Sequence, residues 1–115
     1  MRIFHLAQRQ EWEAAKIVGE YRVSTLGATL CAIGFIHAST SSQLGQVARR
    51  FYSAHPFSRV VLEMDDDLLR ATGIDVRFED GGDGELYPHI YGAITPDLVV
   101  AVLPAAVDDT GRLFY

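Results

Sequence analysis

The sequence GELYPHIYG, residues 84–92, alternates polar or aromatic side chains with aliphatic ones over most of its length. Because successive side chains of a β-strand point to opposite faces, this alternation predicts a strand over residues 87–91 with two different faces. Leu86 and Ile90 would face the core, and Pro88 favours a sheet edge or a strand start, since proline donates no main-chain hydrogen bond. The opposite face would line a pocket with a carboxylate, an imidazole and two phenols, those of Glu85, Tyr87, His89 and Tyr91.

Two further predicted strands carry a histidine each. In the strand predicted over residues 33–38, one face carries Phe35, His37 and Ser39. The strand predicted over residues 2–7 carries His5. We expect His5, His37 and His89 to converge, with ring atoms within about 10–12 Å of a common centre, a span that one ligand pocket can cover. The alternative is that these faces are ordinary polar surfaces, with one buried histidine whose hydrogen bonds are satisfied within the fold.

Helical patterns separate the strands. Residues 10–18 predict one helix, and the spacing of Thr40 and Gln43 is that of a capping box that opens a second helix, which would run to about residue 54. The apolar spacing within these helices predicts that Trp12 and Phe51 are buried.

Further strands are predicted over residues 60–64, 75–79, 98–103 and 112–115. The glycine-rich residues 80–84 predict the most mobile internal loop, either a lid over a ligand or a plain turn. This order of elements predicts an α+β fold, a small single domain over residues 1–115 with a split, mixed but mainly antiparallel β-sheet and two main helices.

The composition excludes several classes of protein. The chain has 115 residues, 49% of them hydrophobic, and a net charge of −5, which is typical of a globular domain. No apolar stretch approaches the roughly 18 residues of a membrane-spanning helix. The absence of a signal-peptide pattern and the single cysteine, Cys31, predict a cytoplasmic protein. A uniformly basic face, typical of nucleic-acid binding, is also absent, so we do not expect a nucleic-acid partner. Residues 1–57 carry a net charge of +3 and could face a small, nucleotide-like anionic ligand.

The residue types on the predicted pocket faces indicate which ligands and reactions the pocket could support. Histidine binds ribose or phosphate oxygens and exchanges protons near neutral pH. A carboxylate can stabilise positive charge at a sugar carbon, and tyrosine rings can stack on planar groups. Two histidines and a carboxylate could also hold a metal, but closely spaced histidine pairs are absent and we predict no metal site. The sequence contains neither a phosphate-binding loop nor a dinucleotide-binding glycine motif.

Three blocks of sequence resemble the DUF952 family, whose biochemical function is not established. The first combines IFHL (residues 3–6) with Trp12 and GEY (residues 19–21), and the second is GFIHAST (residues 34–40) followed by Phe51 and Tyr52. The third and most distinctive is GELYPHIYG. The sequence departs from the family at Ile33, where an acidic residue is common, and this puts any role for that carboxylate in doubt.

The resemblance implies an ADP-ribosyltransferase-like fold, in which a split sheet grips NAD. It assigns His5 to the motif that holds the ribose, His37 with Ser39 to the second motif, and Glu85 or His89 to the third, near the reacting carbon. We therefore expect an NAD- or nucleotide-related transferase or glycohydrolase, with NAD as substrate and no firmly implied cofactor. In this hypothesis the catalytic residues are Glu85, His37 and His89, and the binding residues are His5, Ser39 and Tyr91.

Two alternatives remain open. One is a non-catalytic module that binds a nucleotide or another small anion in the same pocket. The other is a metal-dependent hydrolase.

Overall fold

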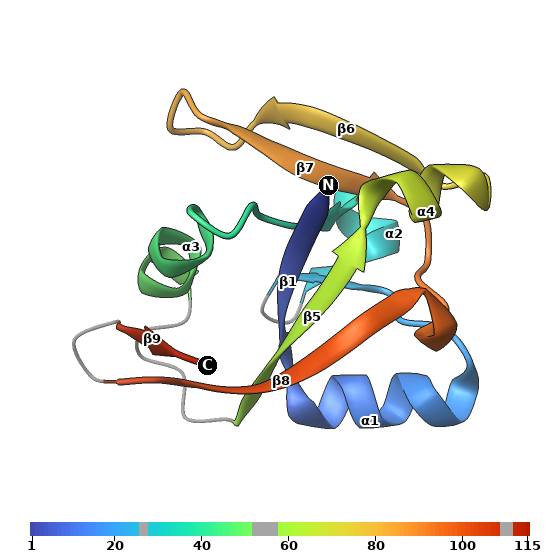
Figure 1. The fold of residues 1–115 in the computed structure, drawn as a ribbon, viewed down its shortest axis with the longest axis horizontal. Helices are drawn as coiled ribbons and strands as arrows, with labels where there is room; N and C mark the ends of the chain where they lie inside the picture. The colour runs from blue at the N-terminus through green and yellow to red at the C-terminus, as the bar shows by residue number, and fades with distance from the viewer. Residues whose placement is uncertain (26–27, 52–57, 109–111) are drawn as a thin grey trace.

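Two antiparallel sheets frame the fold in the computed structural model, which describes residues 1–25, 28–51, 58–108 and 112–115 (Figure 1). In this part of the chain the first sheet has the order β1-β5-β8-β9 and the second has the order β4-β7-β6, while β2 and β3 form a separate pair. The strands of the first sheet are β1 (Arg2–Gln8), β5 (Arg59–Asp65), β8 (Val99–Val107) and β9 (Leu113–Phe114). The other strands are β2 (Val23–Thr25), β3 (Ala28–Thr29), β4 (Ile36–His37), β6 (Asp75–Asp80) and β7 (Leu86–Tyr91).

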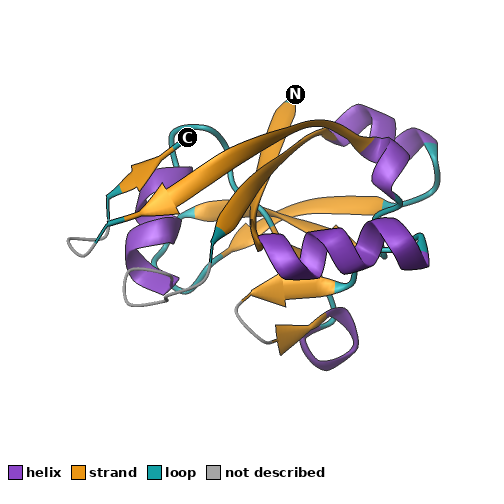
Figure 2. Cartoon of the chain, turned by 90° about the horizontal axis from the view of Figure 1, so that it is seen from below, coloured by secondary structure: helices purple, strands orange, loops and turns teal. Residues whose placement is uncertain are grey.

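The helices are α1 (Arg9–Val18), α2 (Leu30–Ile33), α3 (Leu44–Phe51) and α4 (Asp66–Ala71), with a short 3-10 turn, η1 (Pro96–Leu98). Of these, α1 and α3 pack on opposite faces of the first sheet. Figure 2 shows the helices, in purple, packed around the orange strands. The α+β fold with two main helices and mainly antiparallel strands is therefore confirmed, and among the described residues no helix is long and apolar enough to cross a membrane.

The alternating side chains of β1 divide the core into two clusters. Ile3 and Ala7 pack in the α1 cluster with Trp12, which is 3% exposed, so the prediction for Trp12 is confirmed. Phe4 and Leu6 pack on the opposite face with Leu44, Val47 and Ala48 of α3. The side chain of Phe51 and residues 52–57 lie outside the described part of the chain, so the predictions made for Phe51 and for the end of the second helix stay untested.

A bridge between Phe4 and Ser39 joins the two sheets. The main chain of Phe4 in β1 exchanges hydrogen bonds with Ser39, just beyond β4, at 2.8 and 2.7 Å. The second sheet then continues through β4 to the central strand β7, where His37 lies opposite His89, and on to β6. This arrangement agrees with the predicted split sheet.

The prediction of a strand over residues 33–38 is mostly wrong. Residues 30–33 form α2, because the Thr29 hydroxyl caps it by accepting a hydrogen bond from the N–H of Ala32 at 3.2 Å. Gly34 then ends the helix in the left-handed region at φ 96°, which favours glycine. Only Ile36 and His37 remain extended enough to pair as β4.

Pro88 lies in the middle of the central strand β7, so its predicted place at an edge or a strand start is wrong. Its carbonyl accepts a hydrogen bond from Ala38, just beyond the end of β4. In an antiparallel sheet, the N–H and C=O of one residue point toward the same neighbouring strand. The N–H that Pro88 lacks would therefore point toward Ala38, where β4 has already ended. Leu86, predicted to face the core, is 56% exposed at the start of the strand, whereas Ile90 is buried as predicted.

Candidate functional site

A cavity of about 360 Å³ lies between α3 and the turn that joins β6 to β7. Figure 1 shows these two segments on the same side of the molecule. Its polar walls are formed by His37 from β4, Gln46, Arg49 and Arg50 from α3, and Asp83, Glu85 and Tyr87 from the turn and β7. The cavity therefore combines two cationic side chains, two carboxylates, an amide, a phenol and an imidazole.

Two glutamine amides hold the exposed carboxylate of Glu85. The Nε2 of Gln43 donates to one oxygen at 2.9 Å, and the Nε2 of Gln46 donates to the other at 2.8 Å. Gln43 is buried, and its amide oxygen accepts the Thr40 N–H at 3.0 Å. This is the bond by which a capping-box glutamine satisfies a free N–H ahead of a helix. The same side chain thus opens α3 and positions Glu85, a role that the capping pattern alone did not reveal.

The turn over residues 80–84 is held by its own polar side chains. Asp80 Oδ1 accepts hydrogen bonds from the N–H groups of Gly82 and Gly84 at 2.7 and 3.1 Å. Asp83 accepts the Tyr87 hydroxyl at 2.6 Å and the Glu85 N–H at 2.9 Å. These bonds define one conformation of the turn, and its predicted mobility stays a prediction.

The hydrogen bonds of Asp83 also set its charge. The donated Tyr87 hydroxyl and the Glu85 N–H lower the pKa of Asp83, so it is a carboxylate at neutral pH. Burial and the neighbouring Asp83 raise the pKa of Tyr87, which stays a neutral phenol. Arg50 lies 3.8 Å from Asp83 and partly balances its charge.

His37 is half-buried and lines the cavity. Burial, followed by the charges of His5 and His89, lowers its pKa from 6.5 to about 4. The imidazole that faces the cavity is therefore neutral at pH 7, able to accept or donate a hydrogen bond but not to hold a positive charge.

His5 does not line the cavity, although it bonds the main chain of His37, whose ring lies 5.6 Å from that of His89. One pocket shared by the three histidines therefore stays a prediction. Residues opposite each other in an antiparallel bridge share a face. Phe4 lies opposite Ser39, so its neighbour His5 points to the other face, away from the His37 side chain. Its Nδ1–H donates to the His37 carbonyl at 2.6 Å, and its Nε2 accepts the Tyr21 hydroxyl at 2.8 Å. Burial lowers the pKa of His5 to about 4.

The remaining predicted site residues lie beside the cavity. Ser39 is buried, and its main chain forms the bridge to β1. His89 and Tyr91 share the predicted face with His37, which is confirmed by the pairing of His37 with His89, but neither lines the cavity. A strand rises about 3.3 Å per residue, so Glu85, just before β7, and His89 within it are about 13 Å apart and cannot contact the same ligand atom.

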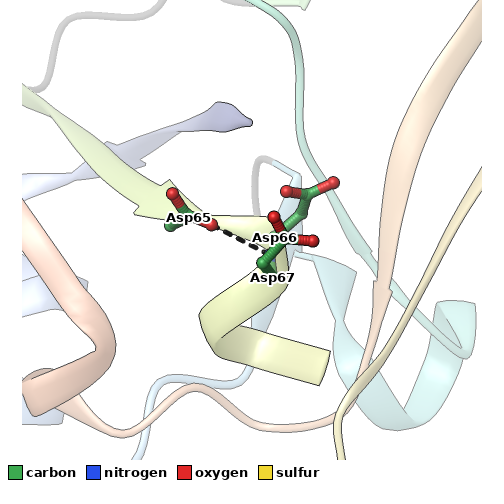
Figure 3. Close-up of side chains that lie close together, drawn as sticks. All are labelled: Asp65, Asp66 and Asp67. Atoms are coloured by element: carbon green, nitrogen blue, oxygen red, sulfur yellow. Dashed lines mark hydrogen bonds between the residues drawn. The ribbon is translucent and has the colours of Figure 1, made fainter. Parts of the chain in front are cut away.

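One acidic cluster among the described residues has the composition of a metal site. The carboxylates of Asp65, Asp66 and Asp67 converge at the junction of β5 and α4 (Figure 3). Asp66 is buried and lies 3.0 Å from the N-terminal ammonium of Met1 and 2.8 Å from Arg70. Burial raises the pKa of Asp66, but the bonds from these two cations lower it overall. Asp65 caps α4 by accepting the Asp67 N–H at 2.9 Å. These contacts give the cluster a structural role.

Comparison with solved structures identifies close structural relatives. The crystal structure of protein CC0527 from Caulobacter crescentus superposes with a TM-score of 0.82 at 26% sequence identity, covering 99% of this chain and 94% of that one. The solution structure of CC0527 gives a TM-score of 0.75, also at 26% identity, and covers 96% and 90% of the two chains.

Comparison by sequence gives the family. No curated protein matches the sequence. The DUF952 family, described as a protein of unknown function, matches residues 6–102. The resemblance carried by the three sequence blocks is thereby confirmed. Over most of its length, the chain belongs to the DUF952 family.

Proposed function

We propose that the chain binds a phosphorylated sugar or a nucleotide in the cavity between α3 and the β6–β7 turn. The observation that carries this proposal is the division of charge in the cavity: Arg49 and Arg50 come from α3, and Asp83 and Glu85 come from the turn. Arginine binds phosphate oxygens with paired, charge-assisted hydrogen bonds. Carboxylates accept hydrogen bonds from sugar hydroxyls. The volume, about 360 Å³, falls in the range of small-molecule sites.

Binding of ADP-ribose and of NAD tests this proposal. A ligand at about 100 times its Kd should stabilise the fold by about 2.7 kcal/mol, which appears as a rise in Tm. Arg49→Gln and Glu85→Gln should each weaken binding about tenfold or more, because each removes a charge-assisted hydrogen bond. Arg22→Gln is the matched control, because Arg22 is exposed, pairs with Glu20 and does not line this cavity. The absence of a calorimetric signal and of a Tm shift with either compound would contradict the proposal.

A second candidate is glycosyl transfer from NAD, or its hydrolysis, of the ADP-ribosyltransferase-like kind. The orientation of Glu85 favours this reaction, because the side-chain amides of Gln43 and Gln46 hold its two carboxylate oxygens at the edge of the cavity. Such a carboxylate can stabilise positive charge at the ribose carbon. The bond from that carbon to nicotinamide breaks and its electron pair leaves with nicotinamide. In hydrolysis, water then bonds to the carbon and releases a proton to the solvent.

Release of nicotinamide from NAD distinguishes catalysis from binding. We expect the wild type to release nicotinamide and Glu85→Gln to lose the activity while the protein stays folded. Binding of NAD without any nicotinamide release would leave the chain a binding module and remove this second candidate.

A further inference from the structure

A row of rings extends from the cavity along the second sheet. Tyr87 and His37, which line the cavity, have ring centroids 5.2 Å apart, and His37 lies 5.6 Å from His89. His89 stacks on Phe35 at 3.9 Å with an interplanar angle of 14°, and Phe35 lies 5.6 Å from Tyr91. We call these five residues the aromatic row. Only the first two take part in the cavity, so the row continues the same face beyond it.

Glu79 holds the far part of the aromatic row. Glu79 on β6 lies opposite Tyr87 on β7. The Glu79 side chain is therefore on the same face of the sheet as the aromatic row. One oxygen, Oε1, accepts Nδ1–H of His89 at 2.9 Å and also accepts the Tyr91 hydroxyl. These two donors lower the pKa of Glu79 and keep it a carboxylate.

The bond to Glu79 determines which ring nitrogen of His89 carries the proton. A carboxylate only accepts hydrogen bonds, so Nδ1 must be the donor, and in a neutral imidazole Nε2 is then an acceptor. Within the described ranges, no group hydrogen-bonds to this Nε2. His89 is 4% exposed, and its ring stacks on Phe35 and lies beside that of His37. In that neutral form, Nε2 of this firmly held ring is an acceptor beside His37, which lines the cavity.

We propose that Glu79 and His89 extend the site, with Glu79 as a positioning residue and Nε2 of His89 as the acceptor for a hydroxyl or N–H group of the ligand. This inference rests on the proposed function, since the ligand is the one bound in the cavity. The His89 ring lies 5.6 Å from that of His37, so a ligand that bonds Nε2 must extend past His37 beyond the cavity.

The tautomer of His89 tests the first half of this inference without any ligand. ¹⁵N NMR of the imidazole nitrogens near pH 7.5 should show the proton on Nδ1 in the wild type. Glu79→Ala should abolish this preference. Asp75→Asn is the matched control, because it removes a carboxylate from the same face of β6 that pairs with Arg77 rather than with His89. A wild-type proton on Nε2, or a tautomer that Glu79→Ala leaves unchanged, would overturn the role of Glu79.

The affinity for ADP-ribose tests the second half. His89→Phe keeps a ring to stack on Phe35 but removes the nitrogen, and thermal unfolding verifies that it folds. We expect His89→Phe and Glu79→Ala to weaken binding about five- to tenfold, the effect of one hydrogen bond, and Asp75→Asn to bind as the wild type does. If Glu85→Gln weakens binding and His89→Phe does not, this inference alone fails. If the wild type does not bind ADP-ribose, the inference fails together with this form of the proposed function.

Discussion

Gly81 lies against the ring of Tyr87 so closely that a side chain has no room. A Cβ at this position would be 2.5 Å from Cε1 of the ring. The ring cannot easily move, because it is buried and its hydroxyl is bonded to Asp83 and Gln46. We therefore expect Gly81→Ala to lower the free energy of unfolding by about 1–3 kcal/mol, as overpacking does.

Urea denaturation measures this loss against Gly45→Ala. Gly45 lies in α3, and a Cβ there meets nothing within 4 Å. That substitution should stabilise the protein by about 0.5–1 kcal/mol, because alanine loses less backbone freedom than glycine in a helix. If Gly81→Ala and Gly45→Ala change the free energy of unfolding equally, the ring of Tyr87 does not exclude a side chain at residue 81.

At the scale of elements, Gln43 ties the start of α3 to β7. Its buried amide accepts the Thr40 N–H and donates to Glu85 and to the carbonyl of Leu86. We expect Gln43→Ala to cost about 1–3 kcal/mol in the free energy of unfolding, since it removes a buried amide whose hydrogen bonds hold the part-buried N–H of Thr40 and the carbonyl of Leu86. The same variant should weaken ADP-ribose binding by freeing Glu85.

Gln43→Glu separates these two roles. Its carboxylate can still accept the Thr40 N–H but would face the carboxylate of Glu85. It should therefore impair binding at least as much as Gln43→Ala. A variant with wild-type affinity would show that the position of Glu85 does not depend on residue 43.

The packing of α1 rests largely on one residue. Trp12 is 3% exposed and its ring lies 6.2 Å from that of Tyr21 in the α1 cluster. Trp12→Ala should cost about 3–5 kcal/mol, as large-to-small core substitutions do. Ile17→Ala on the same helix is the control, because Ile17 is 87% exposed and should have little effect. A loss below about 1 kcal/mol for Trp12→Ala would contradict the burial of this face.

At the scale of the whole molecule, His5 links stability to pH. Its pKa is about 4 in the folded state and 6.5 without burial. Between these values the unfolded chain binds a proton that the folded chain does not, so the free energy of unfolding decreases as the pH falls. The full contribution, present above about pH 6.5, is about 3 kcal/mol, and it is lost progressively down to pH 4.

Urea denaturation at pH 7, 6, 5 and 4 checks this dependence, and NMR titration of the His5 ring gives its midpoint directly. His5→Gln should have a shallower dependence, because it removes one of two histidines, His5 and His37, whose pKa burial lowers to about 4. A titration midpoint of His5 near 6.5 would contradict the prediction.

The strongly periodic elements could be predicted from the sequence. The strands near residues 2–7, 60–64 and 75–79 and the helix at residues 10–18 appear close to their predicted bounds, because their side-chain periodicity matches their burial. The region around α2 could not be predicted in this way. Its four residues are apolar, and a cap at Thr29 with a left-handed Gly34 decides between helix and strand.

Alternation along the chain determined which residues of each strand share a face, because this is a local property of extended backbone. It correctly grouped His37 with Ser39, and Tyr87 with His89 and Tyr91. The relation between strands is not local. The bridge of Phe4 with Ser39 turned His5 away from the cavity, and the pairing of β6 with β7 brought Glu79 to His89.

The composition of the cavity was also a tertiary outcome. Gln46, Arg49 and Arg50 occur on a helix whose sequence pattern predicts only a solvent face. Packing on β1 and Tyr87, together with hydrogen bonds to Glu85, places α3 against the β6–β7 turn. The sequence by itself determined the family, the α+β class and the polar face of β7. The tertiary structure alone decided which side chains meet there, because contacts between distant segments depend on sheet register and helix docking rather than on any one segment.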